Sequence, residues 1–325
     1  MNLPTLRLFR FGLGLVMGVG SAFAHQHGHG DTPRPTVQER LGFAKDAKLL
    51  VIHADDLGMS HSKNVATIEA MKQGVVTSAS LMMPTPWMRE AVAMAKANPG
   101  LDIGVHLTLT AEWNDYKWGP LLGADTVPSL VTADGLFHAT VPAFAEAADV
   151  DEVEAEVRAQ IELALELGVD VTHLDGHMGS LLATDEIAAM YMRIGQEYLL
   201  PIRLHKHFGD GIEGDERLQS AFLNYPANYD TVGGAAPDMF PDGMVDYYNE
   251  VLRETEAGLN LLVLHLGFDE MEDQQIMEGF DPWGAKWRQI DYDWAMSDEA
   301  KQLIQANEII LINNRLIRDK LIRGR

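Results

Sequence analysis

The stretch HADDLGMSHS, residues 53–62, is the clearest indication of the fold in the sequence, because it contains the end of an expected strand. It follows the apolar run LLVI at 49–52 and sets two carboxylates, Asp55 and Asp56, side by side. A short apolar run that ends in polar residues is typical of a buried strand in a parallel sheet. Neighbouring carboxylates raise each other's cost of ionisation, and a bound cation would stabilise them. The alternative is that the pair caps a helix that begins near Ser60.

Outward from this stretch, short β-type runs alternate with helical patterns. Strands are expected at 49–55, 78–84, 102–109, 171–177, 201–205, 260–267 and 308–314. Helices are expected at 60–73, 87–97, 151–167 and 184–198. This alternation implies parallel strands joined by crossovers, in either a doubly wound sheet or a (β/α) barrel. The segments 110–150 and 206–258 are expected to be long, irregular loops that wall a cleft.

Polar residues gather at the carboxyl-terminal ends of the expected strands, which favours the barrel. They are Asp55, Asp56, His106, His173, Asp175, His177, Arg203, His205 and His265. A single histidine in such a place is more often a hydrogen-bonded structural residue, so the argument depends on recurrence. Asp56, His106 and His177 end different strands, and together they would leave positions open for water and substrate around a metal ion.

Two further residues fit around this set. Asp55 would remain a free carboxylate beside the metal and could act as general base. On a strand, residues 173, 175 and 177 share one face, so Asp175 could support a metal ligand from behind or face a neighbouring loop instead. Arg203 could orient Asp55 or bind substrate, and a structural ion pair is an equal alternative.

Aromatic residues follow His106 in the next loop. Trp113 and Trp118 lie there, where their faces could stack on a sugar ring. Ordinary packing within the loop explains them equally well.

The composition is that of a globular protein: the 325 residues are 46% hydrophobic and 22% charged. The formal net charge of −23 should repel nucleic acid and anionic lipid. We therefore expect a small-molecule or oligosaccharide substrate, or a metal, as the partner, and no nucleic acid. A homodimer is left open. The chain has no cysteine, so no disulfide contributes to its stability.

Residues 1–24 resemble a secretory signal peptide. Arg7 and Arg10 precede the apolar run at 11–20, and Ala22-Phe23-Ala24 provides a small-x-small cleavage site. The apolar run is too short to span a bilayer, although a retained anchor is the alternative. We expect cleavage after Ala24, export to the periplasm or the medium, and no stable membrane insertion afterwards.

The expected mature chain would begin with a histidine-containing segment. Residues 25–46 are predicted to be flexible and 47–325 to form a single barrel domain. Cleavage after Ala24 would expose His25-Gln26-His27, whose amine, imidazole and amides could bind Cu²⁺ or Ni²⁺, with His29 as another donor. We favour a polar tail without bound metal over this alternative.

The chain resembles the YdjC family of carbohydrate deacetylases, which includes chitooligosaccharide and hopanoid-biosynthesis deacetylases. The matching motifs are HADDLGMSHSKNVATIEAMKQGVVTSASLMMPTPW at 53–87, GVHLTLT at 104–110, THLDGHMG at 172–179, VLHLGFDE at 263–270, WRQIDYDW at 287–294 and IILINNRLIRD at 309–319. The resemblance implies an irregular (β/α) barrel akin to the polysaccharide deacetylases. It covers nearly the whole expected mature chain.

The resemblance also implies roles for individual residues. Asp55 matches the family's proton acceptor, and His265 matches a residue suited to protonate the leaving amine. The implied metal ligands are Asp56, His106 and His177.

Two segments depart from the family pattern. His53 stands where many members have Asn, and it could contact substrate or support the site. DGHMGSL at 175–181 replaces DGHQHVH, so histidines are missing at 179 and 181. Chitobiose specificity therefore cannot be transferred.

The implied reaction is metal-assisted hydrolysis of an N-acetyl group on a carbohydrate. Two histidine ligands suit Zn²⁺, whereas the family is usually associated with Mg²⁺, so the divalent ion is left open. Two alternatives remain: a metal-dependent phosphoesterase on the same barrel, and a non-enzymatic periplasmic metal-binding protein.

Overall fold

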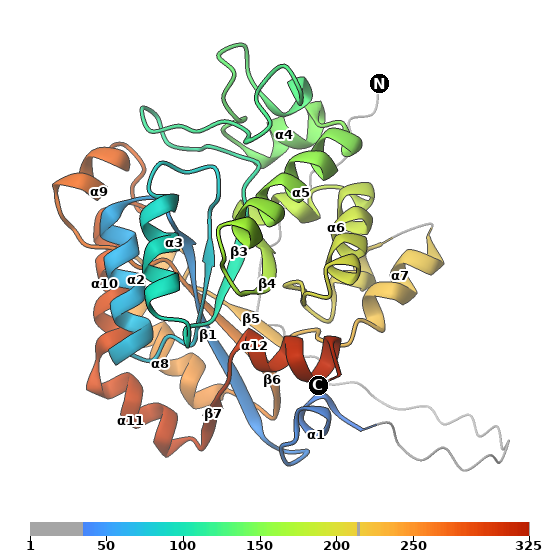
Figure 1. Ribbon diagram of the computed structural model, residues 1–325. Helices are drawn as coiled ribbons and strands as arrows, with labels where there is room; N and C mark the ends of the chain where they lie inside the picture. The colour runs from blue at the N-terminus through green and yellow to red at the C-terminus, as the bar shows by residue number, and fades with distance from the viewer. Residues whose placement is uncertain (1–34, 213–214, 325) are drawn as a thin grey trace, which may run out of the picture. The chain divides into compact units, whose positions relative to one another are not determined.

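The computed structural model describes residues 35–212 and 215–324, which form an α/β fold around a parallel sheet (Figure 1). Its strands are β1 (Lys48–Leu57), β2 (Ser78–Leu81), β3 (Ile103–Leu107), β4 (Val171–Gly176), β5 (Thr231–Gly233), β6 (Gly258–Leu264) and β7 (Ile309–Leu311). Within the described residues the seven-stranded sheet has the order β4-β3-β2-β1-β6-β5, and β7 pairs with β1 outside this path. Every ladder between these strands is parallel, as the alternation of the sequence predicts.

Strand β1 is the centre of the sheet because three strands pair with it. β6 runs beside it from Lys48 to Ala54. On the other side, β7 pairs with its first residues, up to Leu50, and β2 pairs with it from His53 onward. Every residue of β1 after Lys48 is buried, which explains why its first half is a continuous apolar run.

The two adjacent carboxylates lie where β1 becomes irregular. Its register with β2 shifts between Ala54 and Leu57. Asp56 has a φ of 66°, in the left-handed region that few residues other than glycine adopt. A regular strand would send Asp55 and Asp56 to opposite faces. Here both approach Nε2 of His106, with oxygens at 3.9 Å and 3.5 Å.

The ladders do not close into a ring, and the segment 201–205 bridges the gap between β4 and β5. Ile202 forms a single bridge with Leu174, and His205 forms one with Tyr229, which precedes β5. The architecture is thus an irregular (β/α) barrel, and the predicted fold class is confirmed. The strand predicted at 201–205 is wrong in detail, because isolated bridges replace a ladder there.

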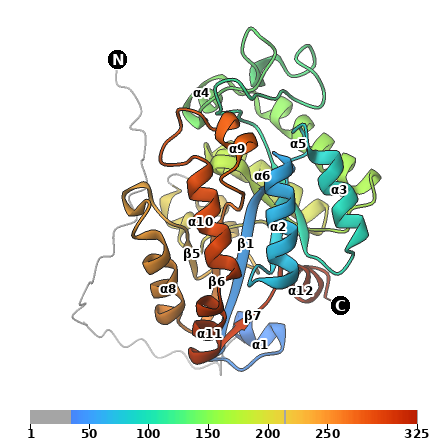
Figure 2. The same cartoon turned by 90° about the vertical axis from the view of Figure 1, so that its left-hand side faces the viewer.

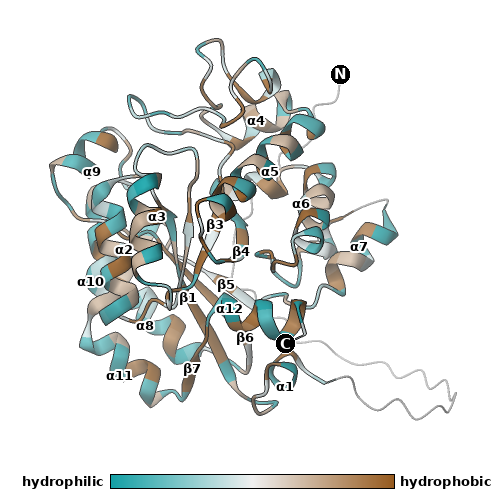
Figure 3. Cartoon of the chain, in the orientation of Figure 1, coloured by the Kyte–Doolittle hydropathy of each residue, from teal (hydrophilic) through white to brown (hydrophobic). Residues whose placement is uncertain are grey.

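Helices pack on both sides of the sheet. They are α1 (Val37–Leu41), α2 (His61–Gln73), α3 (Met88–Ala97), α4 (Val141–Ala147), α5 (Val150–Glu166), α6 (Asp185–Glu197), α7 (Glu216–Leu223), α8 (Met244–Glu254), α9 (Met271–Ile276), α10 (Ala285–Met296), α11 (Asp298–Ala306) and α12 (Asn314–Ile317). Figure 2 shows α2 and α10 side by side in front of β1. Most helices carry both teal and brown turns in Figure 3, as expected where one face packs inward.

Helix α5 shows how the sequence specifies such an element. The Asp149 side chain caps its start by accepting from two backbone N–H groups of the first turn. Val153, Val157 and Ile161 recur at helical spacing, and all are fully buried. Gly168 follows with a φ of 84°, the left-handed conformation that ends many helices.

The prediction of a loop over 206–258 is wrong. This segment contains α7, β5 and α8. Helix α8 buries Met244, Tyr248 and Leu252, spaced four residues apart, so it is a core helix with a narrow buried face. Helices α10 and α11 were also not predicted. The segment 110–150 is largely irregular, apart from α4 and one short 3₁₀ turn.

The amino-terminal predictions lie mostly outside the described residues. These are the signal peptide at 1–24 and the metal-binding alternative at His25, His27 and His29. The described part of the 25–46 segment contains α1, whose cap Thr36 exchanges hydrogen bonds with Glu39. Across residues 35–212 and 215–324, no helix combines the length and the apolar composition that crossing a membrane requires.

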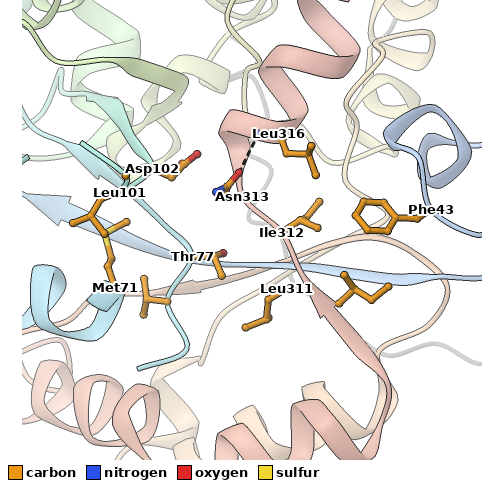
Figure 4. A pocket seen from close by; sticks show the side chains of 12 residues that line it. Phe43, Met71, Thr77, Leu101, Asp102, Leu311, Ile312, Asn313 and Leu316 are labelled. Atoms are coloured by element: carbon orange, nitrogen blue, oxygen red, sulfur yellow. Dashed lines mark hydrogen bonds between the residues drawn. The ribbon is translucent and has the colours of Figure 1, made fainter. Parts of the chain in front are cut away.

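A pocket of about 510 Å³ lies near the amino-terminal ends of β2 and β3 (Figure 4). Its lining is mostly apolar and includes Phe43, Leu101 and Ile312, with Asp102 at one side. The polar cluster described below lies at the opposite ends of the strands. The pocket is therefore separate from that cluster.

Position 104 in β3 must be glycine because the ring of His173 occupies the space that a side chain would need. A Cβ at this position would lie 2.5–2.6 Å from three ring atoms of His173. We expect Gly104→Ala to lower the free energy of unfolding by about 1–3 kcal/mol, since two buried strands must separate to admit it. Urea unfolding measures this. Gly100→Ala is the control because nothing lies within 4 Å of its added Cβ, and an equal loss in both variants would contradict the explanation.

Candidate functional site

Three buried side chains converge at the carboxyl-terminal ends of the strands: Asp56 lies in β1, His106 in β3 and His177 directly after β4. Oδ1 of Asp56 lies 3.5 Å from Nε2 of His106 and 3.4 Å from Nδ1 of His177. The two ring nitrogens are 3.3 Å apart. Such a spacing lets the three atoms share one cation.

The hydrogen bonding of Asp56 fits a cation at this place. Its Oδ1 is buried and has no hydrogen-bond partner among the described residues. A buried carboxylate oxygen left in this way is costly, and a metal ion would satisfy it. The donor set of one carboxylate and two imidazoles suits Zn²⁺ and its neighbours among the transition metals.

In each of the two histidines, the ring nitrogen that faces away from Asp56 is hydrogen-bonded to a carboxylate. Nδ1 of His106 lies 2.8 Å from Oδ1 of Asp175, and Nε2 of His177 lies 2.9 Å from Oε2 of Glu112. Metal-binding histidines almost always make such a bond, which fixes the tautomer and the ring orientation. Asp175 is thus where the sequence analysis expects a supporting group, and the ligand candidate that it supports is His106.

Glu112 was missed by the sequence analysis. It lies in the irregular loop that follows β3, and its distance from His177 along the chain carries no periodic signal. The single indication in the sequence is an acidic residue close after a predicted ligand strand.

Without a cation, the site holds its charges through protonated histidines. Burial lowers the pKa of His106, but Asp175 and Asp55 outweigh this and raise it to about 10. Burial also lowers the pKa of His177, but the neighbouring Glu112 and Asp56 outweigh this and raise it to about 9. Because a metal ligand must be a neutral imidazole, cation binding here should release protons.

Asp55 is an ionised carboxylate that forms a paired hydrogen bond with a guanidinium group. Nη1 and Nη2 of Arg203 donate to its two oxygens at 2.8 Å and 3.1 Å. Burial would raise the pKa of Asp55, but the charges of Arg203 and His106 hold it well below its usual range. Its Oδ2 lies 3.8 Å from Nε2 of His265. Asp55 is thus available as a base beside the three-residue set.

His53 lies beneath Asp55 and joins it to the neighbouring strands. Its Nε2 is 3.1 Å from Oδ1 of Asp55 and 2.9 Å from Oδ2 of Asp175. Its Nδ1 lies 3.0 Å from the hydroxyl of Ser78. With only 1% of its surface exposed, His53 supports carboxylates from below.

His265 follows β6 and faces the same site. Burial and the nearby Arg288 lower its pKa to about 3, so the imidazole is neutral. Its backbone N–H donates to Oδ2 of Asp291 at 2.8 Å. The side chain is 28% exposed, which leaves it accessible to a ligand.

The two tryptophans proposed to contact substrate are buried. Trp113 is 2% and Trp118 is 3% exposed. Trp118 donates from Nε1 to the carbonyl of Thr110 and lies edge-on to His177, whereas Trp113 packs against Phe280. Trp118 therefore backs a site residue, and stacking of either ring on a sugar stays a prediction.

We expect Glu112→Ala to weaken Zn²⁺ binding about 10- to 100-fold, because His177 loses the group that orients it. Competition with a chromogenic chelator measures this affinity. Glu250→Ala, an exposed carboxylate on α8, is the matched control. Equal affinity in the Glu112 variant and the wild type would contradict the assignment of His177 as a ligand.

A pH-dependent loss of stability is expected from Asp291. Burial raises its pKa from 3.8 to about 6. Between these values the folded protein binds a proton that the unfolded chain has released, so stability falls as pH rises through this window.

Asp291→Asn cannot ionise, so its stability relative to the wild type should increase from pH 4 to pH 7, by up to about 3 kcal/mol. Urea unfolding at several pH values measures the difference, with the exposed Asp134→Asn as control. A difference that does not change with pH would refute the raised pKa.

The sequence of the chain is similar to those of proteins named carbohydrate deacetylase. The chain is 27% identical to a protein of Thermoanaerobacter pseudethanolicus named carbohydrate deacetylase, over 83% of this chain and 100% of the relative. A carbohydrate deacetylase of Thermus thermophilus is 31% identical over 82% of this chain and 92% of the relative.

Among solved structures, the chain resembles a protein of Enterococcus faecalis V583 whose suggested role is cellobiose-phosphate cleavage. The TM-score is 0.67 and the identity 25%, over 83% of this chain and 99% of that one. The family model described as YdjC-like protein matches residues 49–306, which include every residue of the site described above. The chain therefore belongs to the YdjC-like protein family.

Proposed function

We propose that the protein is a metal-dependent deacetylase that hydrolyses the N-acetyl group of a carbohydrate. Relatives named carbohydrate deacetylase that match more than four-fifths of the chain support this proposal. The observation that carries it is the contrast between neighbouring carboxylates. Oδ1 of Asp56 has no hydrogen-bond partner and faces two histidines, whereas Asp55 is held ionised by Arg203.

Asp56, His106 and His177 would hold a divalent cation. Such an ion would polarise the acetamide carbonyl and acidify water. Zn²⁺ and Mg²⁺ remain the candidates, and the two imidazole donors favour Zn²⁺.

Asp55 would accept the proton of the attacking water. Its carboxylate is ionised, and Arg203 fixes its plane with a two-pronged hydrogen bond, which suits a positioned base. His265 lies 3.8 Å from it on the accessible side. Because His265 is neutral before reaction, it would have to gain a proton before it could protonate the departing nitrogen.

The substrate that we propose is an acetylated oligosaccharide, which the exported protein would bind in the periplasm or the medium. Support for the location comes only from the signal-like sequence at 1–24, with cleavage proposed after Ala24. The high negative charge of the chain fits a neutral sugar better than nucleic acid.

Asp55→Asn should lower kcat/KM at least 100-fold for acetate release from N-acetylated oligosaccharides, because the base is removed. Bound metal, measured by mass spectrometry on the same preparation, should stay near one equivalent. Asp134→Asn, an exposed substitution of the same type, should keep full activity.

Unchanged acetate release by Asp55→Asn would refute the proposed base. Stoichiometric metal without acetate release by the wild type would favour the alternatives, a phosphoesterase or a metal-binding protein. Assays with phosphoesters then separate these two.

A further inference from the structure

A chain of hydrogen bonds crosses the interior of the barrel and ends at Asp55. It starts at Asp102, a buried residue that directly precedes β3 and borders the pocket of Figure 4. The hydroxyl of Ser78 in β2 donates to Oδ1 of Asp102 at 2.7 Å and lies 3.0 Å from Nδ1 of His53 in β1. Nε2 of His53 lies 3.1 Å from Oδ1 of Asp55. Side chains from β1, β2 and the start of β3 thus connect the pocket with the candidate site.

The single hydroxyl proton of Ser78 fixes the direction of this chain. Because that proton is directed to Asp102, the oxygen of Ser78 has only lone pairs left for its other neighbours. Nδ2 of Asn314 donates to one of them at 3.0 Å. The remaining lone pair faces Nδ1 of His53, so this ring nitrogen must carry a proton.

The other ring nitrogen of His53 also faces acceptors only. Oxygens of Asp55 and Asp175 lie 3.1 Å and 2.9 Å from Nε2. The hydroxyl of Ser80 is 3.0 Å away, but it donates its own proton to Asp175. Nε2 must therefore carry a proton as well, and His53 is an imidazolium. Burial lowers the pKa of His53, but the two carboxylates outweigh this and raise it.

Asp102 is a fixed end for this chain because residues near the end of the polypeptide hold it. Its Oδ2 accepts from the backbone N–H of Arg315, which follows the Asn314 that donates to Ser78. Burial raises the pKa of Asp102, although its hydrogen bonds oppose the rise. Tests of this carboxylate therefore belong at pH 8, which favours its ionised form.

A second hydroxyl contacts the same carboxylate but leads elsewhere. Thr172 of β4 donates to Oδ1 of Asp102 at 3.0 Å, and its oxygen lies 2.9 Å from Nδ1 of His173. Nε2 of His173 is buried and has no hydrogen-bond partner among the described residues, so this branch ends there. Thr172 is therefore a natural control for Ser78.

We propose that Asp102 is a positioning residue for the proposed base, and that it acts through Ser78 and His53. Fixing Nδ1 from behind sets the plane of the imidazolium, whose Nε2–H then holds Oδ1 of Asp55 in place for proton transfer. The proposal rests on the proposed function, since it concerns the base of that reaction.

The first test is kinetic, at pH 8. Ser78→Ala and Asp102→Asn should each lower kcat for acetate release at least ten-fold, because the base is less well placed. KM should stay within two-fold of the wild type, with one equivalent of bound metal. The double variant should be no more than two-fold slower than the slower single variant, because both residues act on one chain.

Thr172→Val is the matched control because it removes a hydrogen bond from the same oxygen of Asp102. Its kcat should stay within two-fold of the wild type. If Asp102→Asn loses its thermal unfolding transition, Ser78→Ala carries the test. A kcat within two-fold of the wild type in Ser78→Ala, or an equal fall in Thr172→Val, would overturn the proposal.

A spectroscopic test does not depend on activity. ¹⁵N NMR of the histidine rings in the full-length, Zn²⁺-loaded protein distinguishes a protonated nitrogen from a bare one, and His53→Gln assigns the signals. Both nitrogens of His53 should be protonated in the wild type and in Thr172→Val, and only one in Ser78→Ala. A single protonated nitrogen in the wild type would overturn the proposal. If no N-acetylated oligosaccharide is hydrolysed, the proposed function fails, while the NMR signals still decide whether the chain exists.

Discussion

The guanidinium group of Arg203 connects residues of three different parts of the barrel at the candidate site. Nη1 of Arg203 lies 2.8 Å from Oδ1 of Asp55 and 3.1 Å from Oδ2 of Asp175. Asp55 belongs to β1 and Asp175 to β4, whereas Arg203 comes from the segment that bridges β4 and β5. The ion pair therefore spans the mouth of the barrel where the ladders fail to close. Without it, two buried carboxylates would lack their common counter-charge, and such losses are strongly destabilising.

The two adjacent aspartates gain different roles because the barrel surrounds them differently. Asp55 faces Arg203 and His53, which satisfy both of its oxygens. Asp56 turns at a left-handed backbone angle and directs Oδ1 to two histidines. A single irregular step in one strand thus separates Asp55, the proposed base, from Asp56, the proposed metal ligand. Environment, and not residue type, distinguishes two carboxylates in other hydrolytic sites as well.

The sequence predicts the parts of this structure that depend on local pattern. Apolar runs locate the main strands, and the polar residues at their ends, such as His106 and His177, lie together because parallel strands share one end. Glu112 and Arg288 could not be predicted in the same way. The position of Glu112 depends on the path of an irregular loop, and that of Arg288 depends on how α10 is rotated against α2. Helix α8 was not predicted because its buried face is narrow and partly aromatic.

The last strand occupies an unusual place beside the first. β7 pairs with β1 from Lys48 to Leu50, below the point where β2 takes over, and Asn314 just after it donates to the hydroxyl of Ser78 at 3.0 Å. The central strand therefore acquires its complete set of neighbours only when residues near the end of the chain are present. Synthesis from the amino terminus leaves part of one edge of β1, Lys48 to Leu50, unpaired until residues 309–311 have been made. Folding to the native barrel is then expected to be largely a late event, governed by a contact between distant parts of the chain.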